Sequence, residues 1–148
     1  MIQRIQTIFL LGVVILSAVL LKLPVYMIQP AASANSPEVA PEIHSVLLSS
    51  NALLLIVNCA IGVVAFVTIF LYKNRNLQIR LGNLGILLTC ALIGLLIFSA
   101  DSISSGTNQV VHYSFGEYLP MVELLLFFLA VRKIKKDEEL VRSADRLR

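Results

Sequence analysis

Four long apolar runs divide this chain and leave it few ways to fold. They cover residues 5–21, 52–71, 81–98 and 118–131, and the segments between them are too short to form a separate soluble domain. A bilayer core about 30 Å thick takes about 20 apolar residues per helical crossing. The runs predict an all-α, polytopic membrane protein with four transmembrane helices within residues 1–131, the fourth being the shortest.

The composition argues against an ordinary soluble domain. Hydrophobic residues make up 57% of the 148 residues and charged residues only 14%. The mean hydropathy is +0.85. A soluble chain of this size has too few polar side chains to cover so much apolar surface. We therefore expect lipid to surround the bundle.

The basic residues lie almost entirely on one side of the predicted spans. Of the 12 lysines and arginines, all except Lys22 precede the first run, lie between the second and third, or follow the fourth. The positive-inside rule places this side, and with it both termini, in the cytoplasm. The sequence has no basic face with interleaved aromatic residues, so we expect no nucleic-acid partner.

The segments outside the spans give weaker indications. Arg4, the first run and Ala32 to Ala34 resemble a secretory signal, but the apolar run is long and the cleavage site distant, which favours an uncleaved anchor. We expect the first outer loop to be extended, with a short helix beginning near Pro41. Residues 99–116 carry a weak strand or turn signal, and residues 72–80 make a tight inner hairpin.

Residues 132–148 predict a basic, amphipathic cytoplasmic tail. Ile134, Val141, Ala144 and Leu147 fall on one apolar stripe, with Leu140 at its edge. Basic residues beside a span attract anionic lipid of the inner leaflet, and a cytoplasmic or membrane protein partner is the alternative ligand. The candidate interaction residues of the hairpin and tail are Arg75, Gln78, Arg80, Lys135, Lys136, Arg142, Asp145, Arg146 and Arg148.

The candidate intramembrane polar residues of the predicted spans are Asn58, Thr89 and Glu123. An intramembrane acid is a functional-site hypothesis by default. Glu123 lies near the outer end of its span, so the sequence favours a structural account in which it snorkels outward or pairs with Lys22. Two small-residue pairs, Gly85 with Thr89 and Cys90 with Gly94, are expected to pack within the bundle.

No residue pattern in the sequence indicates catalysis. There is no GxSxG, HExxH or phosphate-binding glycine loop. Cys59 and Cys90 lie in apolar spans, and His44 and His112 lack metal-ligand spacing. We predict that the protein is not an enzyme and has no catalytic residue, cofactor or metal site.

Several segments resemble one family across the whole chain. They are the opening residues 1–7, the hairpin 73–81, Gly116 with Tyr118 to Pro120, and the closing run 136–148, which ends in LVRSADRLR. They resemble the uncharacterised four-helix inner-membrane proteins of the Bacteroidota, a domain of unknown function. The resemblance implies a multi-pass protein of a bacterial inner (cytoplasmic) membrane, and it implies no activity or catalytic residue.

Three functions remain open at this level. The first is a structural, interaction or accessory subunit that uses the hairpin and the basic tail. The second is a small transporter or channel component formed by oligomerisation, with Asn58, Thr89 and Glu123 along a polar path. An enzyme acting on lipid ranks third, because the interfacial residues offer only scattered acids.

Overall fold

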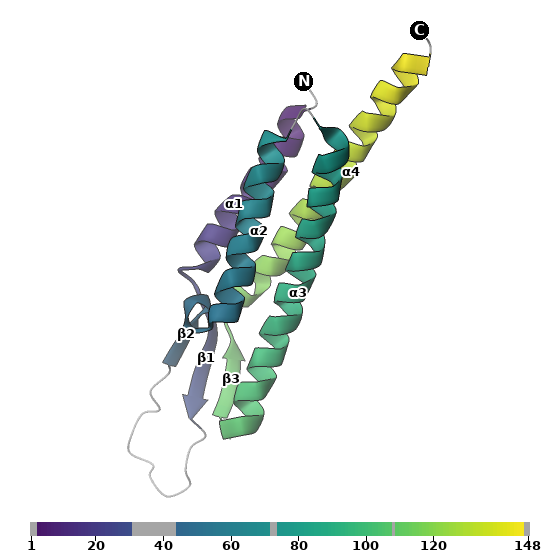
Figure 1. Ribbon diagram of the computed structural model, residues 1–148. Helices are drawn as coiled ribbons and strands as arrows, with labels where there is room; N and C mark the ends of the chain where they lie inside the picture. Colours follow the sequence, from purple (N-terminus) through teal and green to yellow (C-terminus); the bar gives the residue numbers. More distant parts are fainter. Residues whose placement is uncertain (1–2, 31–43, 72–73, 108, 147–148) are drawn as a thin grey trace, which may run out of the picture.

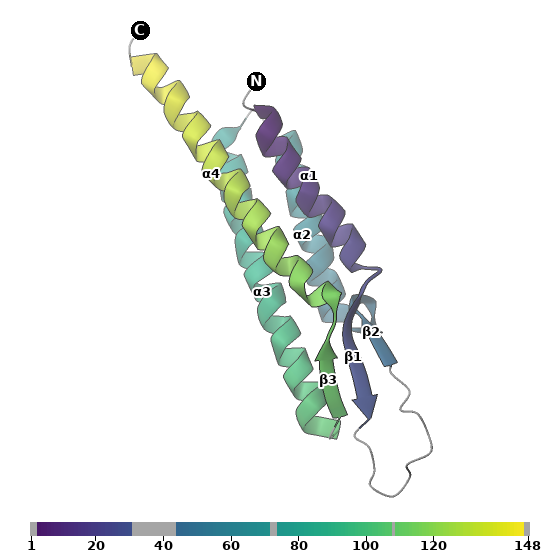
Figure 2. The same ribbon diagram turned by 180° about the vertical axis from the view of Figure 1, so that it is seen from behind.

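Four long helices run side by side in the computed structural model, which describes residues 3–30, 44–71, 74–107 and 109–146. They are α1 (Gln3–Leu20), α2 (Ala52–Phe70), α3 (Arg75–Thr107) and α4 (Leu119–Arg146). A small sheet lies at one end, which we call the sheet end (Figures 1 and 2). The other end, here the hairpin end, holds the start of α1, the end of α2, the start of α3 and the far end of α4.

The helices follow one another around the bundle in chain order. Each packs against its neighbours in the sequence, and α4 closes the ring by packing against α1. Glycines allow α3 and α4 to approach closely, because a Cβ at Gly82 would overlap the side chain of Val131 and one at Gly85 would overlap the ring of Phe127. The mostly helical structure agrees with the predicted all-α class.

The small-residue pairs divide between the inside and the outside of the bundle. Gly85 and Thr89 are buried, as predicted. Cys90 and Gly94 are exposed, and a Cβ at Gly94 would meet nothing within 4 Å. Their predicted packing inside the bundle is therefore wrong. They lie on the other side of α3, since residues one position apart on a helix point about 100° apart.

A three-stranded antiparallel sheet closes the sheet end, with strand order β2-β1-β3. The strands are β1 (Pro24–Pro30), β2 (His44–Leu47) and β3 (Gln109–Tyr113). On β1, Tyr26 pairs with Tyr113 of β3 and Met27 with Ser45 of β2. The weak strand signal within residues 99–116 is thus confirmed at β3.

The connection into α2 differs from the expected short helix. Pro41 lies outside the described residues, and from His44 onward the chain forms β2 and then a 3-10 turn, η1 (Leu48–Ser50). Helix α2 begins at Ala52, where the Asn51 side chain accepts a hydrogen bond from the Leu53 amide at 3.1 Å. Asparagine is a strong N-cap, so it sets this boundary.

Helix α3 extends well beyond its apolar run. It continues from Phe98 through a serine-rich stretch to Thr107, where the sequence predicted a loop. Ser99 and Ser105 donate to the carbonyls of Leu96 and Asp101, which satisfies these hydroxyls on the helix itself. Tyr26 of β1 also binds here, since its hydroxyl lies 2.5 Å from the Leu96 carbonyl oxygen. Contacts with the sheet therefore support this part of α3.

The bundle interior holds several polar side chains beside its apolar core, and many large apolar side chains are exposed on the outside. The buried polar residues of the four helices are Gln6, Ser17, Asn58, Thr68, Gln78, Thr89, Glu123 and Asp137. By length and composition, two of the described helices, α2 and α3, are long and apolar enough to cross a membrane, and the apolar part of α1, Gln6–Leu20, is shorter.

Candidate functional site

The hairpin end carries a continuous polar surface where α3 and α4 meet. We call it the hairpin–tail surface, formed by Arg75, Asn76 and Arg80 of α3 and Lys135, Lys136, Glu138 and Glu139 of α4. Three adjoining grooves with volumes of about 490, 500 and 470 Å³ run across it. Lys135 lines two of them and Arg80 lines two, so the surface is shared between the helices.

Four of the predicted interaction residues come together on this surface. Arg80, Lys135 and Lys136 are exposed, and Arg75 is partly buried because its guanidinium donates to the Asp137 carbonyl oxygen at 3.0 Å. The structure thus joins hairpin and tail residues that are far apart in the sequence.

The remaining predicted interaction residues do not extend this surface. Gln78 is buried, and its amide donates to the Thr68 carbonyl oxygen at 3.2 Å. Gln78 therefore lies outside the hairpin–tail surface, and its hydrogen bond joins α3 to α2. Helix α4 includes Arg142, Asp145 and Arg146, but the described part of the chain does not include their side chains, and Arg148 lies beyond it.

The tail is not a separate surface helix, since α4 continues through residue 131 to Arg146 without a break. Ile134, predicted on the tail's apolar stripe, is 1% exposed and belongs to the bundle interior. Leu140 and Val141 are exposed. The predicted apolar stripe is therefore divided. Ile134 packs inside the bundle, whereas Leu140 and Val141 lie on the surface.

One hydrogen bond that the sequence did not predict joins the tail to the bundle. Asp137 of α4 is buried, and its carboxylate accepts a hydrogen bond from the Gln6 side chain of α1. A signal for this role was present, because Asp137 follows Phe127, Ala130 and Ile134 at the spacing of one buried helix face. Its two acidic neighbours made it look like part of a solvated charge run.

The three polar residues predicted inside the spans all face the interior of the bundle. Asn58 is 1% exposed, and Thr89 and Glu123 are 0% exposed. The Asn58 amide donates to the Ser17 carbonyl oxygen at 3.0 Å, and the Thr89 hydroxyl donates to the Gly85 carbonyl oxygen at 2.8 Å. The predicted snorkelling of Glu123 is wrong, because α4 is rotated so that Glu123 lies on the buried face that also carries Phe127.

Helix packing places Thr89 and Glu123 at the same height in the bundle. Gly85 of α3 contacts Phe127 of α4, and the two helices are antiparallel. One helical turn towards the sheet end leads from Gly85 to Thr89 and from Phe127 to Glu123. Because both helices rise about 1.5 Å per residue, these two residues stay level with each other.

Asn58 reaches the same height from α2. The hydrogen bond between Gln78 and Thr68 aligns α3 with α2 at the hairpin end. Moving ten residues along each helix towards the sheet end brings Asn58 level with Leu88, next to Thr89. We call Asn58, Thr89 and Glu123 the polar layer. Among the described residues of this layer, the side-chain amide oxygen (Oδ1) of Asn58 and both Glu123 carboxyl oxygens have no hydrogen-bond partner.

The described part of the sheet end has no comparable cluster of buried polar residues. His44 and His112 lie on strands on opposite sides of β1, paired with Ile28 and Met27. Among the described side chains, no group of three or more histidine, cysteine, aspartate or glutamate residues is placed to hold a metal ion. Burial raises the pKa of Glu117, and burial likewise raises the pKa of the Tyr26 hydroxyl.

Comparison with known proteins gives one result. The chain matches the family model described as Domain of unknown function (DUF4293) over residues 2–147. The chain belongs to this family. The match covers both the bundle and the α4 extension, so the hairpin–tail surface and the polar layer both lie within the family's domain. No curated protein and no solved structure matches the chain.

Proposed function

We propose that this chain is an integral protein of a bacterial inner membrane that crosses the bilayer four times, with both termini in the cytoplasm. In this proposal it is a structural or accessory subunit, and its hairpin–tail surface binds a protein partner. It acts by binding, without catalysis.

The outward-facing apolar side chains carry the membrane part of this proposal. Each helix exposes large apolar residues, such as Ile8 on α1, Ile56 on α2, Phe98 on α3 and Leu125 on α4, at 64%, 65%, 72% and 59%. In the most apolar stretch of 18 residues in α2, and likewise in α3, only 28% of the residues are buried. Water would solvate such surfaces poorly, whereas lipid solvates them well.

The exposed natural cysteines give a direct test of membrane insertion. Cys59 and Cys90 are on the outer faces of α2 and α3. In sealed native vesicles we expect a charged, membrane-impermeant maleimide to leave both unlabelled and a permeant maleimide to label them after detergent is added. Labelling of either cysteine by the charged reagent in sealed vesicles would contradict the proposal.

The topology is tested in a chain with Cys59→Ala and Cys90→Ala. Ser143→Cys lies on the exposed α4 extension, and Val110→Cys is exposed on β3 at the sheet end. We expect the impermeant maleimide to reach Ser143→Cys only from the cytoplasmic side and Val110→Cys only from the other side. Labelling of both from the same side would exclude four spans.

The docking role rests on the charge and shape of the hairpin–tail surface. Cations and acids lie side by side around the two grooves that Asn76 and Arg80 line, and Gln6, Arg75 and Asp137 hold the tail against the bundle. A prearranged surface loses less entropy on binding than a free tail would. Mixed charges of this kind give a partner orientation and specificity.

Site-specific photo-crosslinking tests the partner. A photoreactive amino acid replaces Asn76, which is exposed and lines two grooves, in cells that express the full chain. We expect a discrete adduct with one protein, identified by mass spectrometry, that disappears with Arg80→Glu. Lys22→Glu, an equal charge reversal at an exposed position of the sheet end, is the control and should leave the adduct unchanged. Equal loss in both variants, or no adduct, would refute docking at this surface.

The polar layer favours a second candidate function, a transporter or channel component formed by oligomerisation. Its three residues share one height and one interior, as a polar path would require. Reconstituted vesicles with an internal pH-sensitive dye test this. Transport predicts a proton or cation flux that Glu123→Gln abolishes and Asp101→Asn, the same change at an exposed acid of α3, preserves. The absence of flux in the unaltered protein would remove this candidate.

A further inference from the structure

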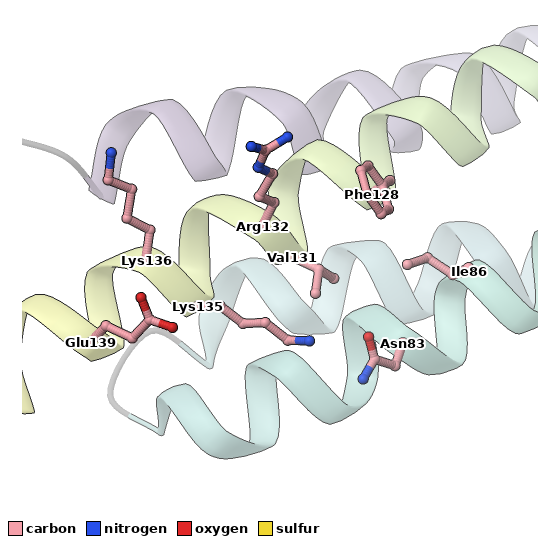
Figure 3. A pocket seen from close by; sticks show the side chains of 8 residues that line it. All are labelled: Asn83, Ile86, Phe128, Val131, Arg132, Lys135, Lys136 and Glu139. Carbon is pink, nitrogen blue, oxygen red and sulfur yellow. The ribbon is translucent and has the colours of Figure 1, made fainter.

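We propose that the groove between α3 and α4 at the hairpin end is a binding site for one anionic phospholipid of the inner leaflet. This site rests on the proposed membrane insertion and adds a defined ligand to it. The groove has a volume of about 490 Å³ and is lined on both helices (Figure 3).

The groove has an apolar half and a basic half. Ile86, Phe128 and Val131 form the apolar half, and all three lie within the predicted spans 81–98 and 118–131. Arg132, Lys135 and Lys136 form the basic half and lie immediately beyond the predicted end of the fourth span. The groove therefore crosses the expected boundary between hydrocarbon and headgroups.

The spacing along α4 produces this arrangement. Phe128, Arg132 and Lys136 follow one another at intervals of four residues, so they lie along one face of α4. Lys135 precedes Lys136 by one position and therefore points to a neighbouring face. In Figure 3, Lys135 extends from α4 on the side of α3, where Asn83 lies, while Arg132 and Lys136 extend in another direction from α4. The three cations that line the groove thus extend from two faces of α4, and Lys135 is the one that extends towards α3.

A phospholipid is the occupant that matches both halves. Three cations complement a phosphate group, for which an arginine offers two parallel hydrogen bonds and each lysine a mobile charge. The exposed ring of Phe128, 56% exposed, offers the first part of an acyl chain an apolar wall. Glu139 is the acid at the far end of the groove, one turn beyond Lys135, and it weakens the attraction for anions there.

Native mass spectrometry of the full-length protein in mild detergent tests the site. The probes are phosphatidylglycerol and phosphatidylcholine with identical acyl chains, added at several concentrations. We expect one phosphatidylglycerol to bind at least tenfold more tightly than phosphatidylcholine. The triple variant Arg132→Gln, Lys135→Gln, Lys136→Gln should lose this preference, and Glu139→Gln should increase it.

Two matched lysine variants distinguish a discrete lipid site from general electrostatic attraction to anionic lipid. Lys133 is exposed on the same helix turn but does not line the groove. We expect Lys135→Gln to weaken phosphatidylglycerol binding about fivefold and Lys133→Gln to change it less than twofold. Equal effects of the two variants would mean diffuse attraction and would overturn the site.

Two alanine variants test the apolar half of the groove, and two competing anions test the identity of its ligand. Phe128→Ala should weaken the binding of both phosphatidylglycerol and phosphatidylcholine. Leu125→Ala, at a similarly exposed position outside the groove, should leave the binding of both lipids unchanged. Displacement of the lipid by millimolar glycerol phosphate would show that the groove binds a free phosphate. Displacement by a polyglutamate peptide would show that it binds an acidic protein segment, and either result would overturn the lipid site.

Failure of this inference is distinguishable from failure of membrane insertion. Membrane insertion is tested by maleimide labelling in sealed vesicles. The lipid site is tested by the binding of phosphatidylglycerol and phosphatidylcholine in detergent. A protein that is protected in vesicles but shows no lipid preference would retain the proposed membrane location and lose only the site.

Discussion

Gln6 and Asp137, separated by 131 positions in the sequence, are joined by a hydrogen bond from the Gln6 amide to the Asp137 carboxylate. The bond connects the first turns of α1 to the part of α4 that extends beyond the predicted spans. Arg75 of α3 adds a hydrogen bond to the Asp137 carbonyl oxygen. Three helices thus meet at one residue of the tail, and this position controls how the hairpin–tail surface is held.

We expect Asp137→Ala to destabilise the hairpin end by about 1–3 kcal/mol, because it leaves the buried Gln6 amide without an acceptor. Hydrogen exchange of α4 beyond residue 131 should increase, while exchange near the sheet end stays unchanged. Glu139→Ala removes an exposed acid from the same helix and is the control. Equal exchange in the two variants would show that the Gln6 bond does not hold the tail.

Gly85→Ala is expected to destabilise the bundle by about 1–3 kcal/mol, because the added methyl group would overlap the ring of Phe127 where α3 and α4 cross. Gly94→Ala on the same helix meets open space and should raise stability slightly through its better helix propensity. Thermal unfolding in detergent measures both. A Gly85→Ala protein as stable as Gly94→Ala would contradict the close packing of these helices.

Tyr26→Phe should lower the unfolding free energy by about 1 kcal/mol, since it removes the hydroxyl that bonds to the Leu96 carbonyl oxygen and to Ser99. Burial raises the pKa of this hydroxyl above its ordinary value of 10.0. Its neutral form is therefore the stabilising one, and its contribution is complete below pH 10 and lost as the pH rises through the raised pKa.

Thermal unfolding measured over a series of pH values tests the role of the Tyr26 hydroxyl. The thermal midpoint of the unaltered protein should fall above pH 10 more steeply than that of Tyr26→Phe. Tyr113→Phe, at an exposed position of the neighbouring strand, should behave like the unaltered protein. If Tyr26→Phe follows the same alkaline fall, the hydroxyl is not the group responsible.

Glu123→Leu is expected to raise the unfolding free energy by about 1–3 kcal/mol. Both carboxyl oxygens are buried without a hydrogen-bond partner, and a leucine removes the cost of burying them. Glu123→Gln keeps the shape and the polarity of the side chain, so its unfolding free energy should rise less than that of Glu123→Leu. Denaturation in mixed micelles compares the three proteins. A marked loss of stability in Glu123→Leu would indicate that this carboxyl group has a stabilising partner in the folded protein.

The sequence was most informative where its pattern is repeated many times. Apolar runs about 20 residues long made the helical class clear, and a strand in residues 99–116 was weakly visible. Element ends were less predictable, because contacts decide them. Asn51 caps α2, and the sheet supports α3 as far as Thr107.

The candidate site was predictable only in part. Arg75, Arg80, Lys135 and Lys136 were identified from their charge and meet on one surface, whereas Gln78 has similar polarity and is buried. Polarity alone does not tell which way a side chain points when both the interior and the surface hold polar groups.

The sequence by itself determined that this chain is mainly helical, where its charges concentrate and which family it resembles, because these properties depend on composition and local periodicity. Only the tertiary structure decided that Glu123 and Asp137 face inward, that Gln6 meets Asp137, and that α3 and α4 form a half-apolar, half-basic groove. Those features depend on how each helix is rotated about its axis and aligned with its neighbours. Contacts such as Gly85 against Phe127 set that rotation, and they join residues that are distant in the sequence.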